Sequence, residues 1–199
     1  MTENDLQTKL QQFDEFFSID HEFNINITAI KHDEINSFDQ FLNSMPLPFK
    51  MASDMVTIDQ SAIRSIQGLS SVATQLADFL NHQSHKIDLL VGYILSQQDD
   101  EDKRFQGLHF GGGGVIFNSD QSFELLQRLE MKIFLLEENC AVYCIGQVVE
   151  SNETDSGFSH KVIFEFIREE DQETLVRHSL HQQSKQLQAL AQKRREQQE

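Results

Sequence analysis

The chain has 199 residues and a mass of 23.0 kDa, the size of a single domain with room for a hydrophobic core. It carries 32 acidic and 16 basic residues, a formal net charge of −16. This excess of acids argues against binding to a nucleic-acid backbone or to an anionic membrane, because both surfaces select for basic residues. Sixteen Phe and only two Pro are typical of a folded protein rather than a disordered one.

The sequence shows no recognisable targeting or membrane segment. Its first residues are polar and acidic, whereas a signal peptide needs a basic start and an apolar run. The longest apolar run, residues 89–95, is far shorter than the roughly 20 residues that span a bilayer. Two Cys are too few for a disulfide framework. We therefore expect a cytoplasmic protein without a membrane anchor.

The first predicted element is a strand over residues 17–29. Apolar residues occupy its odd positions, with His21 as the one exception, and polar residues occupy its even positions. This period of two predicts one buried face and one wet face. A short helix follows, because Ser37 and Gln40 match a capping box, and Pro46 and Pro48 end it.

A long helix is predicted over residues 54–98, where apolar residues recur in steps of three and four. At 1.5 Å per residue it would reach about 65 Å, so it either folds back at Gly68 or projects and packs on another chain. We favour self-association as a coiled coil over a helix hairpin that covers the core within one chain, and a buried Gln83 would then help to set the register. The predicted self-association residues are Leu69, Val72, Leu76, Phe79, Gln83, Ile87, Leu90 and Ile94.

The second half of the chain is predicted to be mostly strands. Residues 99–102, Asp-Asp-Glu-Asp, are expected to form a solvated linker. Strand-like stretches follow at residues 104–117, 129–136, 140–149 and 158–167, with turns at 118–120, 137–139 and 151–157. The first stretch is broken by four consecutive glycines. In the fourth stretch, one face is predicted to carry Phe158, Val162, Phe164 and Phe166.

The last predicted element is a helix over residues 169–195. Acids stand at its start and bases near its end, as the helix dipole favours. A thin apolar seam steps by four and three along it, and the Gln-rich tail is expected to fray beyond Leu190. The seam consists of Val176, Leu180, Gln183, Leu187 and Leu190.

This order of elements resembles the PilZ domain family. The likeness lies in the segments 107–115, 129–135, 142–149 and 162–167. It implies an α+β fold, a six-stranded antiparallel β-barrel with a long helical insertion and a C-terminal helix. The whole chain, 1–199, would be one domain, with the barrel at 16–31 and 103–168, the insertion at 33–100 and the closing helix at 169–195. PilZ domains are receptors for cyclic di-GMP, and in an atypical branch of the family long heptad-bearing helices build an oligomer.

The ligand motifs of the family are where this sequence departs from it. PilZ domains read cyclic di-GMP with Arg-x-x-x-Arg before the first strand and with Asp/Asn-x-Ser-x-x-Gly in the barrel, because phosphates and guanine edges want fixed bidentate donors. No two arginines here are four apart, and none precedes Arg64. Gly112 matches the family glycine, but Gly107 stands in place of Asp or Asn and His109 in place of Ser. Cyclic di-GMP binding of the usual kind is therefore not expected.

Two functional hypotheses remain open. The first is a non-catalytic adaptor of cyclic di-GMP signalling that forms a homodimer or homotetramer and binds an unknown protein partner. The alternative is a receptor that binds cyclic di-GMP, as its only candidate ligand, in a non-canonical way. Backbone amides of a glycine loop can hold phosphate, although a β-bulge or bend is the more economical explanation of such a run. The residues of that candidate site are Lys103, Arg104, Gly107, His109, Gly111, Gly112, Gly113 and Gly114.

Other candidate sites carry weaker signals. The pairs His82/His85 and His178/His181 could build a zinc site only if their helices met, and polar helix faces explain them equally well. Cys140 lies four residues from Cys144 on a predicted strand, too far for a disulfide. No catalytic signature is present. We therefore expect neither an enzyme nor a metal site, and a coiled-coil scaffold unrelated to signalling rests on the long helix alone.

Overall fold

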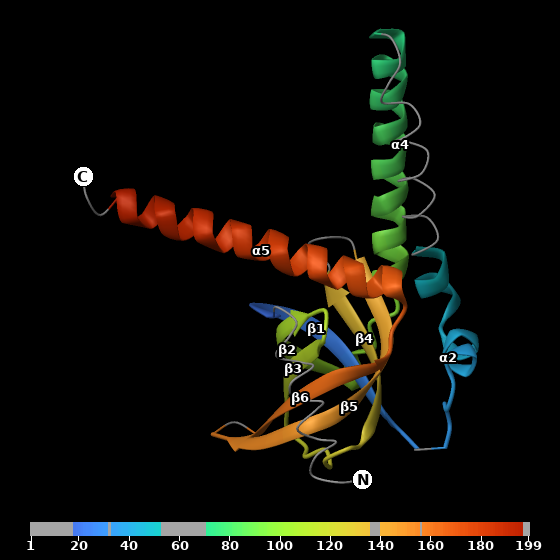
Figure 1. The fold of residues 1–199 in the computed structure, drawn as a ribbon, viewed down its shortest axis with the longest axis vertical. Coiled ribbons are helices and arrows are strands. Elements are labelled where there is room, and N and C mark those ends of the chain that lie inside the picture. The colour runs from blue at the N-terminus through green and yellow to red at the C-terminus, as the bar shows by residue number, and fades with distance from the viewer. Residues whose placement is uncertain (1–17, 32, 53–70, 136–139, 156, 197–199) are drawn as a thin grey trace.

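The computed structural model describes residues 18–31, 33–52, 71–135, 140–155 and 157–196. A barrel lies at its centre, and two long helices extend from it in different directions (Figure 1). The elements are β1 (Ser18–Ile30), α2 (Phe38–Ser44), α4 (Ser71–Ser96), the 3-10 helix η1 (Glu101–Lys103), β2 (Arg104–Gly111), β3 (Gly114–Ser119), β4 (Arg128–Leu135), β5 (Cys140–Thr154), β6 (Gly157–Phe166) and α5 (Glu169–Glu196).

Strands β1 to β6 close into a barrel in the order β1-β2-β3-β6-β5-β4. Every neighbouring pair is antiparallel. Closure removes the open strand edges that would otherwise invite pairing with another chain. The α+β fold class and the closed antiparallel barrel are as the resemblance implies, and the C-terminal helix is as the sequence predicts. Of the helix predicted over residues 54–98, the structure describes α4, and residues 54–70 lie outside the described residues.

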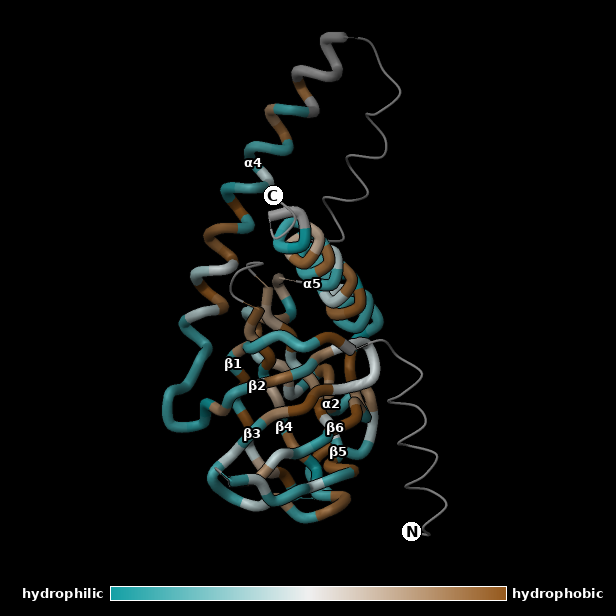
Figure 2. The backbone as a smooth tube through the Cα atoms, turned by 90° about the vertical axis from the view of Figure 1, so that its left-hand side faces the viewer, coloured by the Kyte–Doolittle hydropathy of each residue, from teal (hydrophilic) through white to brown (hydrophobic). Residues whose placement is uncertain are grey.

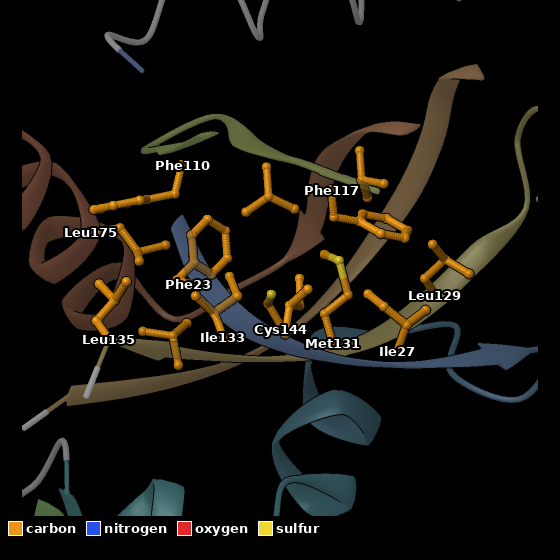
Figure 3. Close-up of a cluster of buried hydrophobic side chains, with 14 of the residues drawn as sticks. Phe23, Ile27, Phe110, Phe117, Leu129, Met131, Ile133, Leu135, Cys144 and Leu175 are labelled. Carbon is orange, nitrogen blue, oxygen red and sulfur yellow. The ribbon is translucent and has the colours of Figure 1, made fainter. Parts of the chain in front are cut away.

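The barrel interior is filled by the apolar face of each strand. The alternation in β1 buries Ile19, Phe23, Ile25 and Ile27, and the pairing of β1 with β2 shifts register between Asp20 and Phe23, at the point where His21 interrupts the pattern. Leu175 from α5 is fully buried in the same cluster (Figure 3). The first turns of α5 therefore close one end of the barrel. The labelled core residues are Phe23, Ile27, Phe110, Phe117, Leu129, Met131, Ile133, Leu135, Cys144 and Leu175.

A second apolar cluster lies on the outer face of β4 and β5. There Phe41 from α2 and Leu95 from the last turn of α4 are both buried against Tyr143 and Phe134. The ring of Phe41 stacks on that of Tyr143, with centroids 5.7 Å apart. The Oγ of Ser37 caps α2 by accepting a hydrogen bond from the Gln40 amide. Both ends of the insertion are thus anchored on the barrel, while the rest of α4 projects away from it (Figure 1).

Several sequence-based expectations need correction. The four glycines end β2 and begin β3, so the broken stretch is a hairpin of two strands. β5 continues to Thr154 because its pairing with β6 holds as far as Gly157, and this shortens the predicted turn. Phe166 packs with the outer cluster, because register shifts in the β5–β6 pairing turn it away from the barrel interior. α5 runs beyond Leu190 to Glu196.

Candidate functional site

The glycine hairpin is tied into the fold by its carbonyl groups. The Gly112 oxygen accepts a hydrogen bond of 2.7 Å from Nε2 of Gln172 on α5. The Gly113 oxygen accepts one of 3.1 Å from the amide of Phe164 on β6. Gly111, Gly112 and Gly114 are buried. The first turns of α5 therefore pack against the hairpin, at the end of the barrel that this helix covers.

Lys103 and Arg104 lie at the opposite end of β2 from the glycines. In the pairing with β1, Arg104 faces Asn26 whereas Gly111 faces Ser18. Seven residues of strand separate the two, about 23 Å at 3.3 Å per residue. The structure does not bring the two basic residues and the glycine hairpin together, because they stand at opposite ends of β2. The proximity assumed for a combined phosphate site is therefore wrong.

The two basic residues have acidic partners of their own. Nε of Arg104 lies 3.0 Å from both carboxylate oxygens of Asp99, and this hydrogen bond raises the pKa of Arg104. Nζ of Lys103 lies 3.7 Å from Asp100. Lys103 and Arg104 are thus ion-paired with acids of the turn that precedes β2.

Gly107 and His109 are also in contact with β1. A Cβ added at Gly107 would lie 2.2 Å from Cζ of Phe23, so the Phe23 ring covers this position. Nδ1 of His109 lies 2.6 Å from Oδ1 of Asp20. The position at which the resembling family places Asp or Asn is covered by an aromatic ring, and the position at which it places Ser forms a surface pair.

The self-association residues of the long helix form an exposed stripe. Leu69 lies outside the described residues, and Val72 is described only as part of the backbone of α4. Gln83 is half-buried, and the apolar members are 44–65% exposed. Leu80 on the same stripe is exposed as well. Apolar positions recur along the projecting part of α4 (Figure 2). The exposed apolar members are Leu76, Phe79, Ile87, Leu90 and Ile94.

Asp99 and Asp100, just after the C-terminal end of α4, form a set of hydrogen bonds that the sequence does not predict, called here the acidic clamp at the foot of α4. Asp99, expected in a solvated linker, has a side chain only 5% exposed. Its carboxylate accepts hydrogen bonds from Asn24 at 3.0 Å and Asn26 at 2.8 Å on β1, besides Arg104. The amide of Asp100 donates to the Asn26 side chain at 2.7 Å. These bonds span more than seventy positions, so no local pattern could have indicated them.

His160 is the second unanticipated polar group. It is fully buried inside an aromatic cage, with ring centroids 5.2 Å from Phe117 and 5.1 Å from Phe123. Nε2 lies 3.0 Å from Oγ of Ser119 and 3.2 Å from the Gln121 carbonyl oxygen, to which it donates in the tautomer that carries the proton on Nε2. Nδ1 is buried with no hydrogen-bond partner in the described part of the chain. Burial lowers the pKa of His160, and the hydrogen bond to Gln121 offsets only part of that effect.

We expect this histidine to make folding sensitive to acid. Below about pH 6.5, the ordinary pKa of histidine, the unfolded chain takes up a proton at His160 that the folded chain resists. The free energy of unfolding should therefore decrease as the pH falls through this range. Replacing His160 with Gln, whose amide can donate to the same carbonyl, should flatten that part of the profile. Urea unfolding at several pH values measures this, and equal slopes for the two proteins would assign the effect to other groups.

No three His, Cys, Asp or Glu side chains are grouped so as to hold a metal ion in the described ranges. Cys140 and Cys144 do not form a disulfide within the part of the chain that the structure describes, and burial raises the pKa of Cys144. Among the helical residues that the structure describes, none forms a segment both long and apolar enough to cross a membrane.

Comparisons with known proteins bear on the fold. No family model and no curated protein matches the sequence. A tetrameric PilZ-domain protein of Xanthomonas campestris, self-assembled through a helical bundle, matches in structure with a TM-score of 0.52 and 12% identity, over 89% of this chain and 96% of the other. The Bacillus subtilis inhibitor of motility MotI/DgrA matches over 86% of this chain with a TM-score of 0.47 and 11% identity, and the match spans 51% of its length. The chain therefore has the fold of a PilZ domain, extended by a long inserted helix and by a C-terminal helix.

Proposed function

We propose that this protein is a non-catalytic adaptor of cyclic di-GMP signalling that self-associates through α4. The observation that carries the proposal is the exposed apolar stripe on this helix. Leu76, Leu80, Gln83, Ile87, Leu90 and Ile94 follow one another in steps of four and three, the spacing of a coiled-coil seam. At 100° per residue these positions fall within about 80° of one another on the helix surface. A projecting helix with such a narrow seam buries it best against a second helix.

The charge and composition of α4 suit pairing with another copy. Asp78, Lys86 and Asp88 are its only charged residues, so two such helices would repel each other little. Burying one Leu side chain is worth about 1.5–3 kcal/mol, and each copy would bury several. Gln83 in the seam would restrict the register. The tetrameric assembly of the Xanthomonas protein supports a dimer or tetramer here.

The test is the molar mass of the wild-type protein and of two variants by light scattering. We expect a dimer or tetramer for the wild type. The double variant Leu76→Gln/Leu90→Gln should be monomeric, with association weakened at least about a hundredfold because two buried Leu are lost from each copy. Leu125→Gln is the matched control, since Leu125 is equally exposed but lies in the loop between β3 and β4. A monomeric wild type, or a double variant that still assembles, would sink the proposal.

Calorimetric titration with cyclic di-GMP tests whether the proposed adaptor binds the nucleotide itself. We expect no saturable heat, because the Phe23 ring covers Gly107 and because Lys103 and Arg104 lie far from the glycine hairpin. The matched sample is the double variant Lys103→Ala/Arg104→Ala. Stoichiometric binding to the wild type that this variant loses would instead make the protein a non-canonical receptor for the nucleotide.

A further inference from the structure

The C-terminal helix α5 has two distinct faces. One face anchors it on the barrel, where Leu175 and Ser179 are buried and Nε2 of Gln186 donates a 2.7 Å hydrogen bond to the Asp20 carbonyl. The other face carries the predicted apolar seam. Its members Leu180, Leu187 and Leu190 are 51%, 59% and 53% exposed. At 100° per residue this seam lies roughly a quarter-turn from the anchoring face, so packing on the barrel leaves it accessible.

The seam of α5 has the spacing of a coiled-coil interface. Val176, Leu180, Gln183, Leu187, Leu190 and Arg194 follow one another in alternating steps of four and three. In heptad terms these are successive d and a positions. Arg177 and Lys193 then occupy the flanking e and g positions, which face the charged residues of a partner helix. Between residues 176 and 194 the flanks are therefore basic wherever they are charged.

The charge of residues 177–195, the larger part of α5, is opposite in sign to that of the remaining chain. Residues 177–195 contain five Lys or Arg and no Asp or Glu, whereas all 32 acids and eleven of the 16 bases lie elsewhere. Two copies of α5 would bring like charges together along the seam, which disfavours their pairing. An acidic helix would meet complementary charges at the same positions. The chain therefore contains one basic segment, residues 177–195, although its overall net charge is −16.

We propose that the seam of α5 binds an acidic amphipathic helix of a partner protein, one with leucine-like residues at its core positions and Glu at its flanks. The proposal rests on the adaptor function and names the kind of partner that an adaptor of this shape would take. A partner helix is about 10 Å wide and can lie along the seam beside the barrel. An anionic bilayer is a plane, and it would also approach Glu169, Glu170 and Glu173 near the N-terminal end of α5 and Asp20 beside Gln186, where the like charges oppose contact.

The experiment uses a fluorescent peptide of about four heptads with Leu at a and d and Glu at e and g, and a matched peptide with Lys in place of Glu. Anisotropy titrations with the full-length protein should show saturable binding of the acidic peptide and at least tenfold weaker binding of the basic one. The variants Leu187→Gln/Leu190→Gln and Arg177→Glu/Lys193→Glu should each weaken binding of the acidic peptide at least tenfold. All four positions are exposed, so the fold should survive, and circular dichroism checks it.

Two controls separate this proposal from its competitors. Gln188→Glu adds an acid on the far side of α5 from the seam and should leave peptide binding unchanged. The α4 variant Leu76→Gln/Leu90→Gln should also bind the peptide normally, so a failure of self-association and a failure of partner binding are distinguishable. Equal binding of both peptides overturns the proposal. So does a lower molar mass of the Leu187→Gln/Leu190→Gln variant, which would assign the seam to a second copy, or seam-dependent binding only to phosphatidylserine-containing vesicles.

Discussion

Replacing Gly107 with Asp should destabilise the barrel rather than restore a ligand contact. This is the position at which the resemblance to PilZ domains places Asp or Asn. A side chain here would overlap the Phe23 ring, since even its Cβ would lie 2.2 Å from Cζ. Overpacking costs about 1–3 kcal/mol, and an unpaired carboxylate in a buried site costs several more. We expect a loss of about 4 kcal/mol or more, a large part of the 5–15 kcal/mol of a typical domain.

Urea unfolding followed by circular dichroism measures this loss, since the chain has no Trp to report by fluorescence. The matched comparison is Gly107→Ala, which adds only the Cβ and should cost about 2 kcal/mol. In a Phe23→Val background that cost should largely disappear, because the ring that meets the Cβ has gone. If Gly107→Asp is as stable as the wild type, the Phe23 ring can move aside and Gly107 is not closed to a larger side chain.

Replacing Asp99 with Ala should destabilise the protein by about 2–3 kcal/mol and loosen the foot of α4. The carboxylate accepts hydrogen bonds from Asn24, Asn26 and Arg104. Its loss leaves the buried Asn26 amide and the Arg104 guanidinium short of an acceptor, which costs more than the bonds themselves contribute. Arg104 is one-third exposed, so water compensates part of its loss. α4 ends at Ser96, three residues before the clamp, and its last turn should open more often.

The stability change is read from urea unfolding, and the opening of α4 from hydrogen exchange of the amides near Leu95. Asp102→Ala is the matched control, because Asp102 is an exposed acid on the adjoining 3-10 turn. It should change stability by no more than about 0.5 kcal/mol. Similar losses of unfolding free energy in the two variants would mean that stability depends on the net charge of the turn and not on the hydrogen bonds of Asp99. Faster exchange confined to α4 in the Asp99 variant would show that the clamp holds the direction of the helix.

The strands could be predicted wherever one face of the chain meets water. β1 and β4 alternate between apolar and polar residues because a barrel strand has an interior and an exterior, and the pattern located both to within a residue. β6 was predicted with its register continuous to Phe166. Shifts in its pairing with β5 break that continuity, and a register shift depends on the partner strand rather than on the strand itself.

In the candidate site too, some features could be predicted from local sequence and others could not. The exposed seams of α4 and α5 follow from spacing alone, because helical periodicity is local, and both appear where the sequence predicts them. The separation of Lys103 and Arg104 from the glycine hairpin depends on β2 being one uninterrupted strand. Arg104 and Gly111, seven positions apart in the sequence, then lie at opposite ends of β2. The hydrogen bonds of Asn24 and Asn26 to Asp99 and of His160 to Gln121 join residues that are 39 to 75 positions apart, and no short pattern carries that information.

By itself, the sequence determined the order of the elements, the α+β class, the two helical seams and the absence of the arginine motif. All of these are properties of residues within a few positions of one another. Only the tertiary structure decided that the Phe23 ring covers Gly107 and that Asp99, an acid in a polar linker, is buried and bonded to β1. Those outcomes depend on which side chains share a volume once the barrel has closed, because closure brings together strands that lie far apart along the chain.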